Sequence, residues 1–223
     1  MKELDYARAN ASTARDLRDA RRMKLYQIQA SANCYRVRLM LSLLGIRAEW
    51  IEVDHKGGEL ESTAFRTLNP FGEVPVLVDG DIRLRDSQAI LVYLARRHGA
   101  AHWLPLEAAD LARIQQWLSF AANEIQNGPR MARGIVLFGR AGDLATALSN
   151  ARRALALLDT RVVDREWLET EAPTVADIAC YPYVSRAVDA EIDLSDYPSL
   201  GRWLKRIERL EGFIPLEAGG PAH

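Results

Sequence analysis

The sequence has few cysteines and no long apolar run, and each shortage excludes a class of protein. Only two cysteines, Cys34 and Cys180, occur in 223 residues, and their spacing fits neither a disulfide framework nor a zinc site. The longest wholly apolar run, residues 90–95, is far shorter than the roughly 20 residues that cross a bilayer. We therefore expect no membrane partner, no metal ion and a reducing, cytoplasmic location.

An excess of charge of either sign is also missing. The chain has 29 Lys and Arg against 30 Asp and Glu, a net charge of −1 and a pI of about 6.4. A protein that binds nucleic acid through its charge usually has a pI above ~9, so we expect no nucleic-acid partner. The length suits one large or two compact folded domains.

Residues 1–22 mix arginines with acidic residues and contain no apolar stretch. A secretory signal needs an apolar segment of ~7–15 residues, and the acidic residues argue against a transit peptide. We expect a leader that is flexible or forms a short helix.

The hydrophobic pattern of residues 24–99 changes period every few residues. Alternation over 24–30 predicts a strand, the longer period from Tyr35 to Gly45 predicts a helix, and 49–54 predicts a second strand parallel to the first. A weak helix over 62–68, two strands over 74–79 and 82–85, and a helix from Asp86-Ser87 to His98 follow. This order predicts an α/β domain.

Strand signals nearly vanish after Pro105. Apolar residues recur at helical spacing over 111–125, 144–158 and 200–210, and Thr174 and Asp177 have the spacing of a capping box. We expect an all-α second domain. The predicted division is a leader (1–22), an α/β domain (23–99), a linker (100–106), a helical domain (107–211) and a tail (212–223).

The turn between the first strand and the first helix is the most informative stretch. A helix N-terminus offers unpaired N–H groups and a partial positive charge, which favour an anion such as a thiolate. Ser31-x-x-Cys34 keeps the spacing of a C-x-x-C redox motif but lacks its first sulfur, so a protein dithiol cycle is not available. Any thiolate then comes from a bound ligand held by the Ser31 hydroxyl. The alternative is that Ser31 and Asn33 only cap the helix.

Two later motifs also allow two interpretations. Pro75 interrupts an apolar strand, which places it at an edge, a bulge or a cis bond. Frequency alone favours trans, because only ~5–6% of X-Pro bonds are cis. Asp86-Ser87 reads as a helix N-cap, and the same N-terminus could hold an amino-acid head group, with Asp86 taking the ammonium.

In this order and spacing, the motifs of residues 23 to about 210 resemble the cytosolic-type glutathione transferases. The likeness is to bacterial serine-type members, with similarity to the theta, zeta and nu-like disulfide-reducing branches. It implies a thioredoxin-like N-terminal domain followed by an all-helical C-terminal domain. It also implies a cytoplasmic, homodimeric detoxification enzyme with glutathione as co-substrate and no metal.

The resemblance implies a role for each candidate residue. Ser31 would hydrogen-bond the glutathione sulfur, Lys56 would reach the glycine-end carboxylate, and the main chain of Val74 would pair with the cysteinyl backbone. Val74-Pro75 resembles the family's cis-proline dipeptide and Asp86-Ser87 the pair that holds the γ-glutamyl group. The candidates are Ser31, Asn33 and Cys34 for catalysis; Lys56, Val74, Pro75, Asp86 and Ser87 for glutathione; and Trp117, Phe120, Asn127, Arg130 and Arg133 for the second substrate.

The resemblance leaves three functions open. The first is a glutathione transferase that activates the thiol for attack on an electrophilic small molecule. Ser31-x-Asn33 with Lys56-Gly57-Gly58 is similar to disulfide-reducing members, so glutathione-dependent disulfide reduction is the alternative; a non-enzymatic interaction protein of the same fold is the third. If Arg130 and Arg133 face the cleft, the second substrate would be anionic or electron-poor. Cys34 is either a buried first-turn residue or a second thiol.

Overall fold

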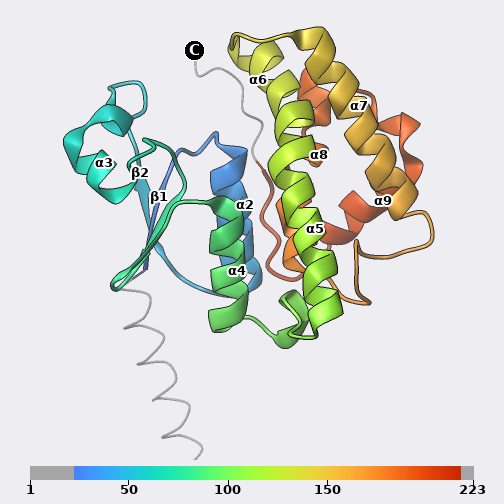
Figure 1. Cartoon of the computed structure of the whole chain (residues 1–223), viewed down its shortest axis with the longest axis horizontal. Coiled ribbons are helices and arrows are strands. Elements are labelled where there is room, and N and C mark those ends of the chain that lie inside the picture. Colours follow the sequence, from blue (N-terminus) through green and yellow to red (C-terminus); the bar gives the residue numbers. More distant parts are fainter. Residues whose placement is uncertain (1–22, 217–223) are drawn as a thin grey trace, which may run out of the picture.

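The structure, a computed structural model, describes residues 23–216 (Figure 1). The predicted leader at 1–22 and most of the predicted tail lie outside the described residues. Four strands form one sheet in the order β2-β1-β3-β4: β1 Met23–Gln27, β2 Glu49–Glu52, β3 Val76–Asp79 and β4 Ile82–Leu84. Strand β1 is parallel to β2, as a strand-helix-strand unit requires, and β3 is antiparallel to both β1 and β4.

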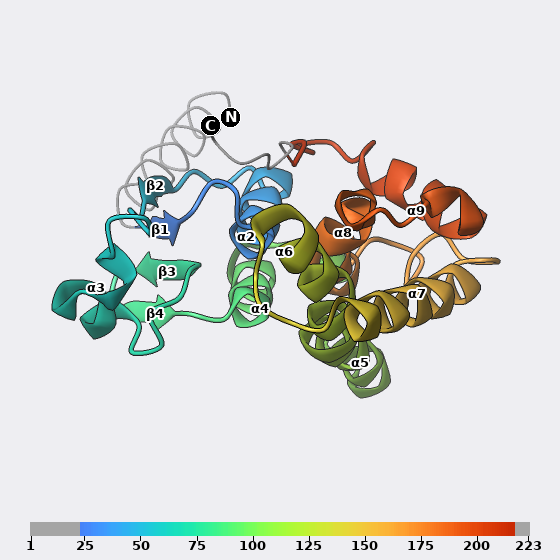
Figure 2. The same cartoon turned by 90° about the horizontal axis from the view of Figure 1, so that it is seen from above.

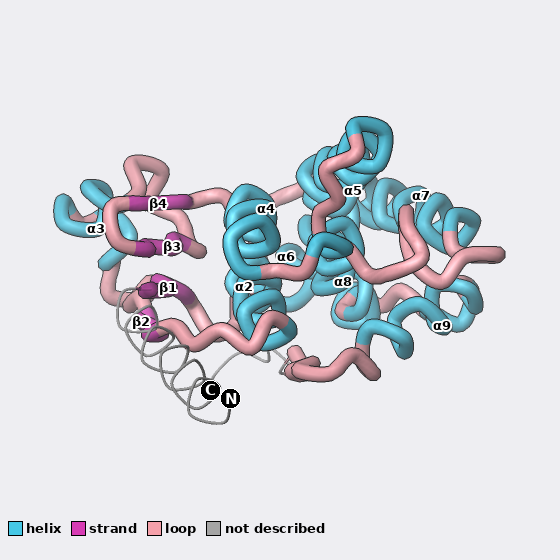
Figure 3. The backbone as a smooth tube through the Cα atoms, turned by 90° about the horizontal axis from the view of Figure 1, so that it is seen from below, coloured by secondary structure: helices cyan, strands magenta, loops and turns pink. Residues whose placement is uncertain are grey.

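Helices cover both faces of this sheet (Figures 2 and 3). The helices α2 (Ala32–Leu43) and α4 (Ser87–His98) lie on one face, and the short α3 (Thr63–Leu68) lies on the other. Residues along β1 alternate between buried and partly exposed, with Leu25 fully buried. The face formed by α2 and α4 is in turn covered by the helical half, so these two helices are packed from both sides.

The second half is helical. It comprises α5 (Ala108–Ile125), α6 (Met131–Phe138), α7 (Leu144–Arg161), α8 (Val175–Ser185) and α9 (Pro198–Ile207), with a π-helix at Gln126–Arg130. Short 3-10 turns lie at Glu59–Glu61, Ala101–Trp103, Ala187–Ala190 and Leu194–Asp196. Within residues 23–216, no helix is long and apolar enough to cross a membrane. The thioredoxin-like half followed by an all-helical half confirms the predicted fold class.

Several predicted details are wrong. Helix α2 begins at Ala32 rather than near Tyr35, because Ser31 already caps it. Strand β3 begins at Val76 rather than Val74. The Val74–Pro75 bond is cis, as the family resemblance implies, whereas frequency alone favours trans. The predicted linker at 100–106 contains a 3-10 turn. The exact domain boundaries stay predictions.

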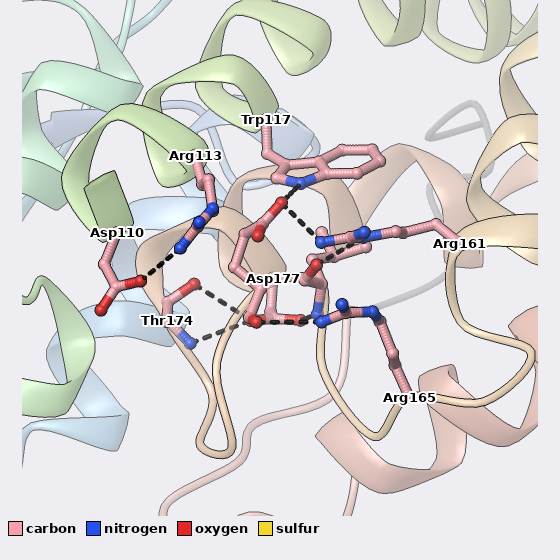
Figure 4. Close-up of polar contacts among 9 residues, drawn as sticks. Asp110, Arg113, Trp117, Arg161, Arg165, Thr174 and Asp177 are labelled. Atoms are coloured by element: carbon pink, nitrogen blue, oxygen red, sulfur yellow. Dashed lines mark hydrogen bonds and ion pairs between the residues drawn. The ribbon is translucent and has the colours of Figure 1, made fainter.

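A buried carboxylate links several segments of the helical half by hydrogen bonds (Figure 4). Asp177, fully buried in the first turn of α8, accepts hydrogen bonds from the Thr174 amide (2.9 Å), the Leu168 amide (3.0 Å) and the Trp203 indole (2.9 Å). Thr174 in turn caps the helix, so the predicted capping box is present. Burial raises the pKa of Asp177, and the hydrogen bonds from Trp203, Thr174 and Leu168 oppose that rise. One side chain thus joins α8, α9 and the loop before them.

We predict that Asp177→Ala lowers the free energy of unfolding by about 3 kcal/mol, because each buried donor left without an acceptor costs about 1–3 kcal/mol. Urea titration followed by circular dichroism measures the change. Glu171→Ala is the matched control, since Glu171 is an exposed acid in the same loop. Equal effects of the two substitutions would contradict the anchoring role of Asp177.

Candidate active site

A cleft of about 550 Å³ lies between the two halves of the molecule. Both halves contribute polar side chains to its lining. From the α/β half these are Ser31, Asn33, His55 and Glu73, and from the helical half Gln126, Arg130, Arg133, Arg140 and Tyr183. The site is therefore built by packing the helical half against α2 and the loops next to it.

Ser31 lies where β1 gives way to α2, at the wall of the cleft. Its Oγ accepts a hydrogen bond from the Cys34 amide (3.3 Å), which fixes the hydroxyl over the helix N-terminus. The first turn of α2 contains no acidic residue, so no carboxylate there offsets the positive end of the helix dipole. An anion placed in the cleft beside Ser31 meets a hydroxyl and a helix N-terminus together.

Cys34 lies behind this wall rather than in it. The side chain is completely buried and is absent from the cleft lining. Burial raises the pKa of the Cys34 thiol, and the weaker effects of the Ser31 hydroxyl, the Ile28 backbone and the Arg38 charge lower it. A buried thiol of raised pKa is a poor nucleophile. Both cysteines are free and buried, and burial also raises the pKa of Cys180.

The segment before β3 forms another part of the α/β wall of the cleft. Glu73 and Val74 line it, whereas Pro75 is buried next to them. The pairing between β1 and β3 ends at Tyr26 opposite Val76, so the main chain of Val74 lies outside the sheet ladder. A strand end of this kind can pair with the backbone of an extended peptide.

Asp86 and Ser87 lie at the N-terminus of α4 and are not part of the cleft lining itself. The Asp86 carboxylate caps α4 by accepting from the amides of Gln88 (3.0 Å) and Ala89 (2.9 Å). The structure thus confirms the N-cap, and Asp86 is exposed to solvent.

An aromatic contact joins the α4 N-terminus to the cleft. The Arg85 guanidinium, one residue before Asp86, lies 3.9 Å from the centre of the Phe71 ring. Phe71 precedes Gly72, which lines the cleft. The contact thus connects the residue before Asp86 to the loop that contributes Gly72 to the cleft.

The buried arginine Arg36 contacts Ser87, and the sequence analysis did not predict a role for it. Arg36 of α2 is 2% exposed, and its NH1 group donates to the Ser87 Oγ at 2.7 Å. Its Nε has no hydrogen-bond partner within the described chain. Burial lowers the pKa of Arg36, against the raising effects of Tyr183, Cys180 and Asp86. Because the Ser87 oxygen accepts a hydrogen bond from Arg36, the Ser87 hydroxyl proton is free to donate to another acceptor.

Lys56 lies near the cleft without lining it. The side chain is exposed, and its neighbour His55 takes the place in the wall. The loop is shaped by Asp54, whose Oδ1 accepts from the Gly57 amide at 2.8 Å. A Cβ on Gly57 would lie 2.2 Å from Asp54 Oδ2, so a side chain at this position would displace the Asp54 carboxylate.

The helical wall depends on a π-helix at the end of α5. Gly128 lies so close to α7 that a Cβ would come within 2.8 Å of the Ala151 amide nitrogen. This close approach holds the π-helix Gln126–Arg130, whose first and last residues both line the cleft. Such π-helical turns are frequent at functional sites because they change which side chains face inward.

Three predicted second-substrate residues lie elsewhere. Trp117 is not in the lining; its indole donates to Glu169 (Figure 4). Its ring lies edge-on to the ring of Phe120, with 5.3 Å between the ring centres. Asn127, in the π-helix that follows α5, is exposed and donates to Asn123 of α5 at 2.9 Å. Trp117, Phe120 and Asn127 are therefore not among the residues that line the cleft, whereas Arg130, the last residue of the π-helix, is.

The sequence reading missed other lining residues, chiefly His55, Phe138, Arg140 and Tyr183. His55 could have been found because it directly precedes Lys56, which the sequence did predict as a binding residue. Arg140 could have been found because it follows Arg130 and Arg133, which were also predicted. No sequence signal pointed to Tyr183, because it comes from α8, far along the chain. Within residues 23–216, no group of three His, Cys, Asp or Glu side chains could hold a metal ion.

Two family models match the chain. Residues 25–102 match the model described as glutathione S-transferase, N-terminal domain, and residues 111–211 match glutathione S-transferase, C-terminal domain. The first match covers the α/β half and the second covers the helical half.

Individual relatives agree with the family models. Glutathione S-transferase 1 of Manduca sexta is 30% identical over 89% of this chain and 93% of its own length. The disulfide-bond oxidoreductase YfcG of Escherichia coli is 29% identical over 78% of this chain and 85% of its own. The solved structure of a glutathione transferase homolog from Drosophila mojavensis, with bound glutathione, has a TM-score of 0.78 at 26% identity and covers 85% of this chain and 88% of its own.

Proposed function

The chain belongs to the glutathione transferase family, and on that premise we propose that it activates the thiol of glutathione for attack on a small electrophile. The observation that carries the proposal is the position of Ser31, at the N-terminus of α2 and in the wall of the cleft. Bound glutathione in the Drosophila mojavensis homolog supports the choice of thiol.

Ser31 acts on the sulfur of glutathione. Its hydroxyl donates to the thiolate while its oxygen accepts from the Cys34 amide, so both functions of the hydroxyl are used. The helix N-terminus adds a partial positive charge. Both effects stabilise the thiolate over the thiol and lower the thiol pKa. The thiol proton leaves to solvent, and the thiolate attacks the electrophilic atom of the second substrate.

The rest of glutathione extends along the α/β wall. The main chain of Val74, beside the cis bond to Pro75, pairs with the cysteinyl backbone of the ligand. Asp86 attracts its ammonium group. Ser87, whose oxygen accepts from Arg36, turns its own proton to the glutamyl carboxylate, and the buried Arg36 charge favours the same anion. Lys56 reaches the glycine-end carboxylate of glutathione. Asn33 lies nearer the sulfur, next to Ser31.

The second substrate lies against the helical wall, whose lining includes Arg130 and Arg133. Disulfide reduction is the second candidate activity. It is favoured by the likeness to the disulfide-bond oxidoreductase of Escherichia coli and by Asn33, which lines the cleft next to Ser31. In that reaction one glutathione thiolate attacks a disulfide sulfur and a second glutathione resolves the mixed disulfide, releasing two thiols and glutathione disulfide.

We propose that the enzyme works in the reducing cytoplasm, where it detoxifies electrophiles. The free, buried state of Cys34 and Cys180 supports this location. We also propose a homodimer. It is supported by large apolar side chains that remain exposed on the α/β half and the turn after it, such as Phe71 (61% exposed) and Leu106 (71% exposed).

Ser31→Ala should lower kcat/KM for a standard electrophile, 1-chloro-2,4-dinitrobenzene, about 10- to 100-fold. One hydrogen bond to a charged group contributes about 1.5–3 kcal/mol, and each 1.36 kcal/mol is about tenfold in rate. The rising limb of the pH–rate profile should move to higher pH, because the bound thiol then ionises less readily. Stopped-flow titration of the bound thiolate measures the same shift directly.

Ser31→Thr, which keeps the hydroxyl, and Cys34→Ala are the matched variants for this test. We expect Ser31→Thr to restore part of the rate, and Cys34→Ala to retain most of it because the thiol is buried. A small disulfide substrate is assayed in parallel. Loss of disulfide reduction in Cys34→Ala but not in Ser31→Ala would replace the serine mechanism with a cysteine mechanism.

Asp86→Asn should raise KM for glutathione about tenfold while leaving thermal stability nearly unchanged. Asparagine caps a helix as well as aspartate does, so only the charge that meets the ammonium is lost. Asp143→Asn is the control, because Asp143 caps α7 in the same way and does not line the cleft. Calorimetric titration with glutathione checks the result; unaltered affinity would remove Asp86 from the site.

Light scattering should give a mass of about twice 25.0 kDa. Phe71→Asp should shift the equilibrium toward the monomer, because it places a charge in the proposed contact. Leu157→Asp, on the exposed side of α7, should have no such effect. A monomeric wild-type protein at micromolar concentration would refute the proposed dimer.

A further inference from the structure

The helical wall of the cleft carries an excess of positive charge. Arg130, Arg133 and Arg140 all line it, whereas the only acidic side chain in the lining, Glu73, belongs to the opposite wall. This asymmetry contrasts with the chain as a whole, whose net charge is −1. The charge is therefore gathered locally at the place where the second substrate would lie.

The nearest carboxylate does not neutralise this wall. Asp189 forms an ion pair with the buried Arg133 (2.7 Å) and a two-pronged pair with Arg186 (2.9 and 2.6 Å). One carboxylate thus faces two guanidinium groups. Arg130 and Arg140 have no carboxylate within ion-pair distance in the described part of the chain. Asp189 fixes Arg133 in place and leaves the other two cations for a ligand.

An aromatic ring lies among these cations. Phe138, at the end of α6, is 41% exposed and lines the cleft. The guanidinium carbons of Arg133 and Arg140 lie 5.1 Å and 5.9 Å from the centre of its ring. A flat apolar ligand can stack on this ring while its polar substituent reaches a guanidinium.

The stem of Arg140 packs closely against Gly134 of α6. The Arg140 Cδ would lie 3.2 Å from a Cβ at that position, so the stem of Arg140 rests against α6. The Arg140 amide also donates to the Gly134 carbonyl (3.2 Å). These contacts hold Arg140 along the wall of the cleft.

We propose that the second substrate is an aromatic electrophile carrying an anionic group, such as a carboxylate. Its ring packs on Phe138 and its anion is held by Arg130 and Arg140. This inference rests on the proposed glutathione transferase activity. For a chloronitrobenzoate, the glutathione thiolate attacks the ring carbon that bears chlorine. The C–S bond forms, the C–Cl bond breaks, and chloride leaves with the bonding electron pair.

The test compares two electrophiles that differ in charge and share one ring: 4-chloro-3,5-dinitrobenzoate and the neutral 4-chloro-3,5-dinitrobenzamide. Arg130→Gln and Arg140→Gln should each lower kcat/KM for the benzoate about tenfold, because a charge-assisted hydrogen bond is lost. The loss with the benzamide should be less than threefold. Arg153→Gln, an exposed arginine of α7 outside the lining, should change neither value.

Two further readouts separate charge recognition from other roles. The benzoate kcat/KM should fall with added salt in the wild type more steeply than the benzamide value, because salt screens the attraction. Affinity for the two glutathione conjugates is measured by calorimetry, and the carboxylate conjugate should lose more affinity than the amide conjugate in Arg140→Gln. The binding experiment needs no turnover.

Equal losses for benzoate and benzamide would overturn the inference, since the arginines would then only shape the cleft. A raised KM for glutathione with unchanged discrimination between the electrophiles would also overturn it, because the arginines would then hold glutathione itself. Inactivity of the wild type with both electrophiles would contradict the proposed function instead. In that case, a preference for the carboxylate conjugate that is lost in Arg140→Gln would still support the anionic subsite, and equal affinities would refute it.

Discussion

One buried carboxylate anchors α8, the helix that packs against elements of both halves. Asp177 joins the first turn of α8 to the loop at Leu168 and to Trp203 of α9. Helix α8 is buried along almost its entire length and packs against α2, α4 and α5. A helix in this position cannot tilt without moving α2, whose N-terminus forms the candidate site. The polar network far from the cleft therefore holds the cleft in shape.

The cleft divides its chemistry between the two halves. The α/β wall presents a helix N-terminus with the Ser31 hydroxyl and the unpaired strand end at Val74, features suited to an anionic sulfur on a peptide backbone. The helical wall presents arginines and an aromatic ring. This division explains why neither half alone would form the site, since the sulfur and its target must meet where the walls face each other.

Arg36 shows how a costly buried charge can be retained. It lies between α2 and α4, with one hydrogen bond to Ser87 and an Nε that has no partner in the described chain. A buried cation without a close counter-charge is expensive for folding alone. A ligand carboxylate at the α4 N-terminus would provide that counter-charge, so binding would recover part of what folding loses.

The sequence by itself determined the order of strands and helices in the α/β half, the two-part fold and the box formed by Thr174 and Asp177, and it offered the cap at Ser31 as one of two roles. These features follow from hydrophobic period and from side-chain groups that act on backbone within four residues. The cis bond at Pro75 could be inferred only through a family likeness, because local frequency favours trans. Only the tertiary structure decided which side chains face the cleft. Trp117 and Asn127 are not in the lining, whereas Arg140, from the segment after α6, and Tyr183, from α8 far along the chain, belong to it. Local patterns fix elements, but a site made where two halves pack depends on long-range contacts that no local pattern records.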